Sequence, residues 1–251
     1  MPAISTAEIK FVRSLSLKKN RDREGLFIVE GDKLVAEALK SGWKIERIYR
    51  RDEIGEAAMA KISATASPAP SLAVVHQPFG VKSSGPEDIC RMLSENALFL
   101  GLDSVRDPGN LGTILRIADW FGIKAVFASP DTVEVFNPKT VQATMGAIFR
   151  VKIIYTDLVA VSETITMRGG SVYGTFLNGD NIYSRQLNTG TDKPSMIIVG
   201  NEANGITPSI EKVVSDRLFI PPYPSGDSGS ESLNVAVATA VAVAEFRRRI
   251  L

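Results

Sequence analysis

A short stretch near residue 200 combines the residue types that bind ligands at the end of a buried strand. Residues 196–199 read Met-Ile-Ile-Val, an apolar run typical of a strand buried on both faces. The run leads into Gly200, Asn201 and Glu202, and Gly205 follows shortly after. Glycine lets the backbone turn sharply or approach a ligand closely, and open α/β sheets bind ligands at the carboxyl ends of their strands. The stretch predicts a ligand site; an ordinary strand-to-helix turn with a solvated Glu202 is the alternative.

A second stretch places an amide and a cation on one expected helix. Asn110 lies at the start of this helix and Arg116 on its body. A helix amino terminus offers free N–H groups and partial positive charge to a phosphate. Arg116 could pair with such a phosphate, where orientation and charge stabilisation suit a guanidinium that keeps its proton. The alternative is an ordinary ion pair of Arg116 with Asp107 or Asp119.

A third stretch, residues 232–240, reads Ser-Leu-Asn-Val followed by small residues. In this order and at these separations, the three stretches resemble the three motifs of the SpoU (TrmH-like) family of RNA 2′-O-ribose methyltransferases, part of the wider SPOUT class. The matching residues are Asn110, Gly112 and Arg116 in the first motif, Gly200, Asn201, Glu202 and Gly205 in the second, and Ser232 to Val235 in the third.

The resemblance implies a parallel-sheet methyltransferase domain with a trefoil knot, which uses S-adenosylmethionine as methyl donor. It implies that Glu202 orients the arginine or the ribose, and that the third motif binds substrate or positions Glu202. The implied catalytic residues are Asn110, Arg116, Glu202, Ser232 and Asn234, and the implied cofactor-binding residues are Thr175, Phe176, Leu177, Gly200, Asn201, Gly205, Ile220 and Leu233. Plain core packing is the alternative for Ile220 and Leu233. The Ser/Gly-rich segment between these two residues is longer than is usual in the family.

From residue 97 onward, apolar strand patterns alternate with helical ones. This alternation predicts a mostly parallel sheet covered by helices on both faces. Strands are expected at 97–102, 124–128, 151–155, 171–176, 196–199 and 217–220, with a loop at 177–181, and helices at 110–121, 138–147, 158–167, after 207–208 and at 233–249. The last helix is apolar on nearly every side, so it must be buried widely, and the resemblance implies a C2 homodimer through it. No two glycines are two positions apart, which argues against a dinucleotide-binding crossover and an α/β oxidoreductase.

The first 80 residues predict a small α/β domain of their own. A short helix and a basic loop are expected within 5–24, strands at 25–31, 44–51 and 72–75, and helices at 33–40 and 53–63. The pattern is similar to the substrate-binding domain that precedes many SpoU domains, which resembles ribosomal protein L30e. Lys18, Lys19 and Arg23 are then candidates for RNA contact, as is Arg116; simple exposure is the alternative. The predicted organisation is an L30e-like domain at 1–80, a linker at 81–95 and the methyltransferase domain at 96–251.

Composition narrows the functional classes further. Residues 1–51 hold 12 Lys or Arg against 7 Asp or Glu, a basic balance that suits a phosphate backbone or an ordinary solvated surface. No apolar run is long enough to span a membrane, and one His and one Cys cannot form a His/Cys metal cluster. Composition thus favours a cytoplasmic protein without a His/Cys metal site. The resemblance implies that it methylates a ribose 2′-hydroxyl in RNA, and the two-domain layout favours ribosomal RNA over transfer RNA. The alternative is a non-catalytic RNA-binding or ribosome-assembly protein that retains the knot.

Overall fold

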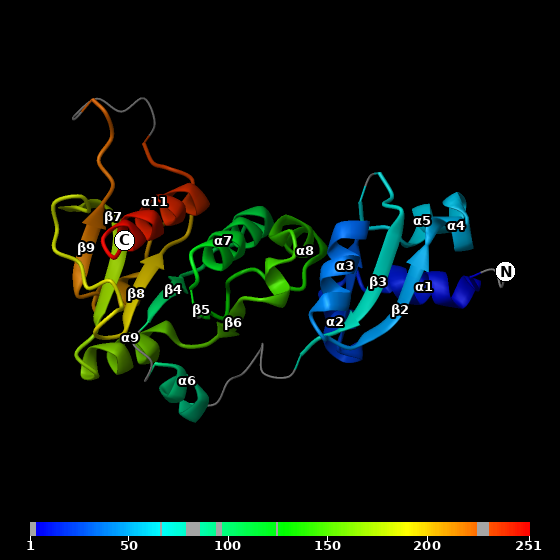
Figure 1. Ribbon diagram of the computed structural model, residues 1–251, viewed down its shortest axis with the longest axis horizontal. Helices are drawn as coiled ribbons and strands as arrows, with labels where there is room; N and C mark the ends of the chain where they lie inside the picture. The colour runs from blue at the N-terminus through cyan, green and yellow to red at the C-terminus, as the bar shows by residue number, and fades with distance from the viewer. Residues whose placement is uncertain (1–3, 66, 79–85, 94–96, 124, 225–230) are drawn as a thin grey trace. The chain divides into compact units, whose positions relative to one another are not determined.

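The computed structural model describes residues 4–65, 67–78, 86–93, 97–123, 125–224 and 231–251 (Figure 1). The chain forms two compact units. The first unit comprises residues 1–79 and 134–150, and the second comprises residues 80–133 and 151–251. No described helix is both long enough and apolar enough to cross a membrane.

The first unit is built on a three-stranded antiparallel sheet in the order β1-β3-β2 (Figure 1). Helices α1 and α5 cover one face of this sheet, where Val12, Leu15 and Met59 join a buried apolar cluster. Helix α3 packs against β1 and β3. The elements are α1 (Thr6–Ser14), α2 (Lys18–Glu24), β1 (Leu26–Glu30), α3 (Asp32–Lys40), β2 (Ile45–Arg50), α4 (Arg51–Ile54), α5 (Glu56–Ile62) and β3 (Ser71–His76).

The basic loop predicted within residues 5–24 is wrong, because Lys18 and Lys19 begin helix α2. The cause is Arg21, which lies on α2 and is only 2% exposed. Its guanidinium donates to the carbonyl oxygens of Leu15 and Ser16 at 2.9 and 2.8 Å and pairs with Glu134 at 2.6 Å. A buried cation needs such partners, so the turn of helix that carries it is fixed in place.

Segment 134–150 lies inside the range 96–251 but packs with the first unit. It contains α8 (Pro138–Thr144) and the 3₁₀ turn η1 (Ala147–Phe149). Phe136 lies against Phe27 with ring centroids 4.7 Å apart, and Phe149 meets Trp43 at 5.1 Å. The helix predicted over 138–147 ends early, because Met145 adopts a left-handed conformation with φ of 50°.

The second unit is built on a six-stranded sheet in the order β6-β5-β4-β8-β7-β9, and every neighbouring pair is parallel (Figure 1). This confirms the predicted parallel sheet. The strands are β4 (Leu98–Leu102), β5 (Ala125–Ala128), β6 (Lys152–Tyr155), β7 (Ser171–Asn181), β8 (Ser195–Val199) and β9 (Asp216–Phe219). The helices are α6 (Pro86–Met92), α7 (Pro108–Trp120), α9 (Leu158–Met167), α10 (Pro208–Glu211) and α11 (Val235–Arg248). Residues of α6, α9 and α10 share one buried cluster with the sheet, whereas α7 and α11 pack against each other (Figure 1).

Two boundaries differ from the prediction. Strand β7 continues through the expected loop at 177–181, because it pairs with β9 on both sides of an irregularity between Thr175 and Asp180. The predicted linker contains helix α6, whose Ile89 is buried in the core together with the adjacent Leu93. An apolar contact with the sheet stabilises a helix that sequence periodicity alone does not reveal. The linker positions 81–85 and 94–95 lie outside the described residues.

The carboxyl end of α11 is held by arginines. Arg247 donates to the carbonyl oxygens of Phe121 and Gly122 at 2.8 and 3.0 Å. Arg249 donates to the carbonyl oxygen of Ile182 at 2.7 Å and pairs with Glu245. Hydrogen bonds from Arg248 and Arg249 lower the pKa of Glu245 to about 2, so this carboxylate stays charged within the described network. The last helix is thereby fixed to the loop after α7 and to the segment after β7.

Candidate active site

The first motif begins at a capped helix. Asp107 is the N-cap of α7, and its carboxylate accepts the backbone N–H of Asn110 at 2.8 Å. Pro108 occupies the first helical position, where a missing N–H costs nothing. Helix α7 therefore starts slightly before the predicted position, and Asn110 lies in its first turn.

The second motif forms a tight turn after β8. The Asn201 side-chain oxygen accepts the N–H groups of Ala203 and Asn204, both at 3.0 Å. The backbones of Asn201 and Gly205 exchange two hydrogen bonds of 2.9 Å. This doubly closed turn presents Glu202 on its exposed side.

The structure brings all three motifs together through one chain of side chains within the second unit. The Asn110 amide donates to a Glu202 carboxylate oxygen at 2.7 Å. The Asn234 amide donates to the Asn110 side-chain oxygen at 2.9 Å. Asn234 is also the N-cap of α11, with its side-chain oxygen accepting the N–H of Ala236 at 2.9 Å. An amide, a carboxylate and a second amide from distant parts of the sequence thus converge on one site.

Two predicted catalytic residues lie outside this chain of hydrogen bonds. Arg116 is exposed on α7 and makes no hydrogen bond or ion pair with any residue that the structure describes. The alternative pairing with Asp107 or Asp119 is therefore not observed in the described part of the chain. Ser232 is exposed, and its side chain likewise makes no hydrogen bond to a described residue. Both side chains remain available to a substrate.

The predicted cofactor-binding residues lie on several elements: Gly200 and Asn201 follow β8 and Ile220 follows β9, whereas Thr175, Phe176 and Leu177 lie at the irregularity inside β7. The Thr175 hydroxyl donates to the Ile198 carbonyl oxygen at 3.4 Å, which links β7 to β8. Leu177 is 66% exposed and Leu233, just before α11, is 49% exposed. Core packing therefore does not explain Leu233, whereas Ile220 is half-buried.

Gly200 lies at the tightest point of this region. A Cβ atom built there would lie 2.2 Å from the Gly205 carbonyl carbon, a distance no real contact allows. Phe176 lies at the irregularity in β7. The Arg217 guanidinium lies over its ring, 3.8 Å from the ring centroid. The region therefore combines closely approaching backbone at Gly200 with the exposed apolar side chain of Leu177.

The sequence analysis missed three polar residues near this site: Asp103, Ser104 and Asp131. Asp103, directly after β4, is 3% exposed and accepts the N–H of Thr207 at 2.6 Å. Ser104 accepts the Asn201 amide on its carbonyl oxygen at 2.8 Å. Hydrogen bonds from Ser104 and Ser129 lower the pKa of Asp131. The position of Asp103 at a strand end, the same signal that singled out Glu202, could have identified it.

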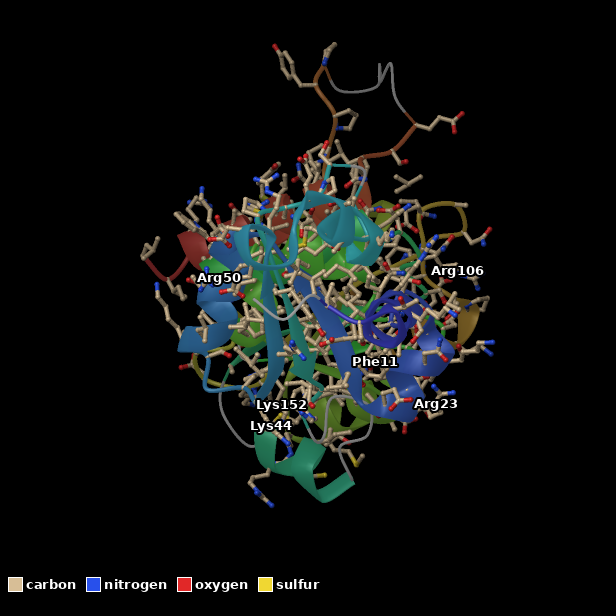
Figure 2. All side chains as sticks on the ribbon, turned by 90° about the vertical axis from the view of Figure 1, so that its right-hand side faces the viewer. Phe11, Arg23, Lys44, Arg50, Arg106 and Lys152 are labelled. Atoms are coloured by element: carbon tan, nitrogen blue, oxygen red, sulfur yellow. The ribbon has the colours of Figure 1, made fainter. Side chains whose placement is uncertain are left out.

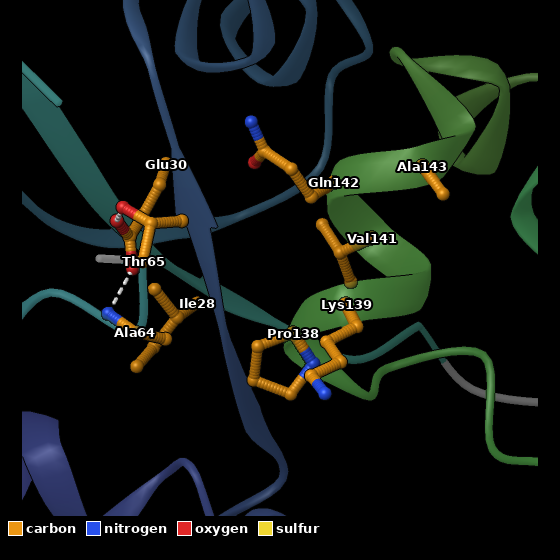
Figure 3. Close-up of a pocket in the computed structure, with 9 residues that line it drawn as sticks. All are labelled: Ile28, Glu30, Ala64, Thr65, Pro138, Lys139, Val141, Gln142 and Ala143. Carbon is orange, nitrogen blue, oxygen red and sulfur yellow. Dashed lines mark hydrogen bonds between the residues drawn. The ribbon is translucent and has the colours of Figure 1, made fainter. Parts of the chain in front are cut away.

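The first unit contains a cavity of about 460 Å³ between β1, the loop after α5 and α8 (Figure 3). None of the predicted site residues lines it. Its one carboxylate, Glu30, accepts hydrogen bonds from Ser63, Ala64 and Thr65. Since this carboxylate is already engaged in holding a loop, the cavity is not a candidate for the catalytic site.

The predicted RNA-contacting residues of the first unit are exposed on α2. Lys18 is paired with Asp22 at 2.7 Å, and Arg23 is paired with Glu24 at 2.7 Å. Lys19 makes no ion pair with a described residue. Arg23, Lys44 and Arg50 extend from the outside of this unit (Figure 2).

Comparison with known proteins decides the family. The model of the SpoU rRNA methylase family matches residues 97–244. The chain belongs to the SpoU rRNA methylase family. The model of an MRM3-like substrate-binding domain matches residues 6–73, so the SpoU domain follows a substrate-binding domain as expected.

Relatives of this SpoU protein match it over nearly its whole length. The 23S rRNA (guanosine(2553)-2′-O)-methyltransferase RlmP of Bacillus subtilis is 31% identical over 96% of this chain and 96% of its own. A solved structure of a TrmH-family protein from Porphyromonas gingivalis is 37% identical with a TM-score of 0.85, covering 99% of this chain and 100% of that one. The AdoMet-bound rRNA methyltransferase from Sinorhizobium meliloti is 28% identical with a TM-score of 0.84, covering 100% and 98%. These matches confirm the predicted fold class, a SPOUT methyltransferase domain preceded by a small α/β domain.

Proposed function

We propose that this protein transfers a methyl group from S-adenosylmethionine to a ribose 2′-hydroxyl of ribosomal RNA. The observation that carries the proposal is the hydrogen-bonded chain Asn234–Asn110–Glu202, which joins the three family motifs at the strand ends. Ribosomal RNA is favoured over transfer RNA because RlmP of Bacillus subtilis, which aligns over 96% of both chains, is named for methylation of 23S rRNA.

The residues at the strand ends fit S-adenosylmethionine. The bare backbone at Gly200 and Gly205 and the exposed apolar side chains of Leu177 and Leu233 offer contacts to an adenosine. Bound there, it would supply a sulfonium-activated methyl group, and the overall transfer would yield the 2′-O-methylated ribose, S-adenosylhomocysteine and one proton released to water. The protein then needs to align donor and acceptor, and alignment alone accounts for several kcal/mol of catalysis.

The roles of the site residues follow from their partners. Glu202 and Asn234 are held through Asn110, and the Glu202 carboxylate is exposed and can accept a further hydrogen bond from the ribose. Arg116 is free to bind an RNA phosphate beside the reacting sugar, where a guanidinium forms charge-assisted hydrogen bonds. Ser232 supplies a hydroxyl next to Asn234 for the same substrate.

The function is tested by two measurements. Ribosomal RNA from cells with and without the protein is mapped for 2′-O-methylated riboses, and we expect one site to lose its methyl group. Calorimetry with S-adenosylmethionine is expected to show binding by the purified protein. Absence of both signals would support a non-catalytic RNA-binding protein with the same fold.

RNA contact by the first unit is tested on α2. We expect the double change Lys19→Ala and Arg23→Ala to weaken rRNA binding and to reduce the slope of log K against log salt by about 1 to 2, because each lost phosphate contact lowers the slope by about 0.7 to 0.9. Filter binding between low and moderate salt measures the slope. The control is Lys152→Ala with Lys193→Ala, which removes the same charge from exposed positions of the second unit. Equal effects of the two pairs would contradict a specific role for α2.

A homodimer through the second unit is a further part of the proposal. Trp120 on α7 is 85% exposed, and Leu233 and Val237 are half-exposed at the start of α11. An exposed apolar patch marks an interaction site, and we expect a C2 interface to include the part of α11 that carries Val237. We expect sedimentation to show a dimer and Val237→Asp to shift it towards monomer, since an interface buries an unpaired charge only at high cost. Met167→Asp on α9 is the control, because it places the same charge at an apolar position that is 80% exposed. A wild-type monomer at micromolar concentration would contradict the dimer.

The matched ranges 6–73 and 97–244 support functional domains at 1–80 and 96–251 with a connection at 81–95. A substrate of ribosomal RNA supports a cytoplasmic location, and a single cysteine is compatible with a reducing compartment.

A further inference from the structure

A loop that carries none of the three motifs holds the second motif in place. It follows β4, and its Ser104 adopts a left-handed backbone conformation with φ of 59°. Serine rarely takes this conformation, so surrounding contacts must fix it. The Ser104 N–H donates to the Ser129 hydroxyl oxygen at 2.8 Å.

The contacts converge on one carboxylate. Asp131 accepts the Ser104 hydroxyl on one oxygen at 2.6 Å and the Ser129 hydroxyl on the other at 2.7 Å. Ser129 thus receives the backbone N–H of Ser104 while its own hydroxyl is oriented by Asp131. Arg106 is the one charged group that faces this carboxylate among the described residues, and at 3.4 Å it is only a weak partner.

The left-handed conformation aims the Ser104 carbonyl oxygen at the second motif. That oxygen accepts the Asn201 amide at 2.8 Å. The other end of the Asn201 side chain closes the turn that carries Glu202. From Asp131 to Glu202, each residue is therefore joined to the next by a hydrogen bond or by the chain itself.

We propose that Asp131 is a positioning residue for ribose methylation, which acts by holding Ser104 so that Asn201 and the turn keep Glu202 in its working position. The proposal rests on the proposed function. Asp131 reaches no motif side chain directly, and half of its side chain is exposed, so its contribution is to geometry at the site.

The first test compares Asp131→Ala in two backgrounds. In the otherwise unchanged enzyme, we expect kcat for tritium transfer from labelled S-adenosylmethionine to rRNA of a deletion strain to fall about 10-fold, because small displacements of an aligned group cost that much or more. The Kd for S-adenosylmethionine should change less than kcat, since Asp131 makes no direct contact with a predicted cofactor-binding residue. In a Glu202→Ala background, adding Asp131→Ala should cost less than about 2-fold, since Glu202 is no longer there to be positioned. Asp131→Asn keeps an acceptor oxygen and should retain more activity than Asp131→Ala.

The control is Asp157→Ala. Asp157 is an exposed carboxylate that caps α9 by accepting the Val159 N–H at 2.8 Å. Its loss should lower the unfolding temperature with kcat unchanged, which separates a stability effect from a positioning effect.

A second readout needs no activity. Hydrogen exchange at the N–H groups of Ala203 and Asn204 should accelerate in Asp131→Ala and stay unchanged in Asp157→Ala. Unaltered exchange, an unchanged kcat in Asp131→Ala, or an equal loss in both Glu202 backgrounds would overturn the positioning role. If Glu202→Ala alone retains the full rate, the proposed function of that residue fails instead, and the exchange data still decide whether Asp131 holds the turn.

Discussion

Replacing Arg116 with alanine should lower kcat for ribose methylation by about 100-fold or more, roughly 3 kcal/mol, a typical cost of removing one preorganised donor from a reacting centre. The unfolding temperature should not change, because Arg116 is exposed and makes no hydrogen bond or ion pair with any described residue. Single-turnover methylation with labelled S-adenosylmethionine measures the rate, and calorimetry checks that cofactor binding is preserved.

Arg116→Lys is the matched comparison for this experiment. It keeps the charge but loses the planar fork that binds a phosphate or ribose through two hydrogen bonds. We expect the lysine variant to fall between wild type and alanine. Full activity in Arg116→Ala would show that this cation takes no part in the reaction.

Gly200→Ala should have the second large effect. The added methyl group would lie 2.2 Å from a backbone carbon of Gly205, so the turn or the end of β8 must move. Forcing extra atoms against backbone costs about 1 to 3 kcal/mol of unfolding free energy, and displacement of the strand end should abolish S-adenosylmethionine binding. Denaturant unfolding and calorimetry measure the two losses.

Gly205→Ala separates crowding from backbone strain. Gly205 has φ of 69°, yet a Cβ there would meet no atom within 4 Å. Gly205→Ala should therefore lower the free energy of unfolding by about 1 kcal/mol, the cost of an alanine in the left-handed conformation. The variant should still bind S-adenosylmethionine. If the two alanine variants behave alike, crowding at Gly200 is not what shapes the strand end.

The site residues that could be predicted from sequence are those marked by a local pattern, such as the end of a strand or the start of a helix. Glu202 follows a buried strand, and Asn110 and Asn234 each lie at the amino-terminal end of a helix. These positions carry local signals, and parallel strands bring their carboxyl ends to the same edge of the sheet. The hydrogen bonds among the three side chains confirm that the motifs meet, while their catalytic roles stay predictions.

The residues that were missed depend on contacts distant in sequence. Nothing near Asp131 indicates that its carboxylate receives the hydroxyl of Ser104, 27 positions earlier. Helix α2 was predicted as a loop because the sequence does not show that Arg21 is buried and paired with Glu134, which lies 113 positions later. Strand β7 was predicted too short because its second half pairs only after β9 is in place. Each error reflects tertiary contact overriding a local pattern.

The hydrogen bond between Asn110 and Asn234 joins positions 124 residues apart. Asn234, the later of the two residues in the sequence, is the N-cap of α11. Hydrogen bonds from Arg247 and Arg249 hold the carboxyl end of the same helix. During translation, Asn110 leaves the ribosome long before α11 emerges, and domains take shape as their segments become available. A nascent chain therefore lacks the hydrogen bond between Asn234 and Asn110 until α11 has been synthesised.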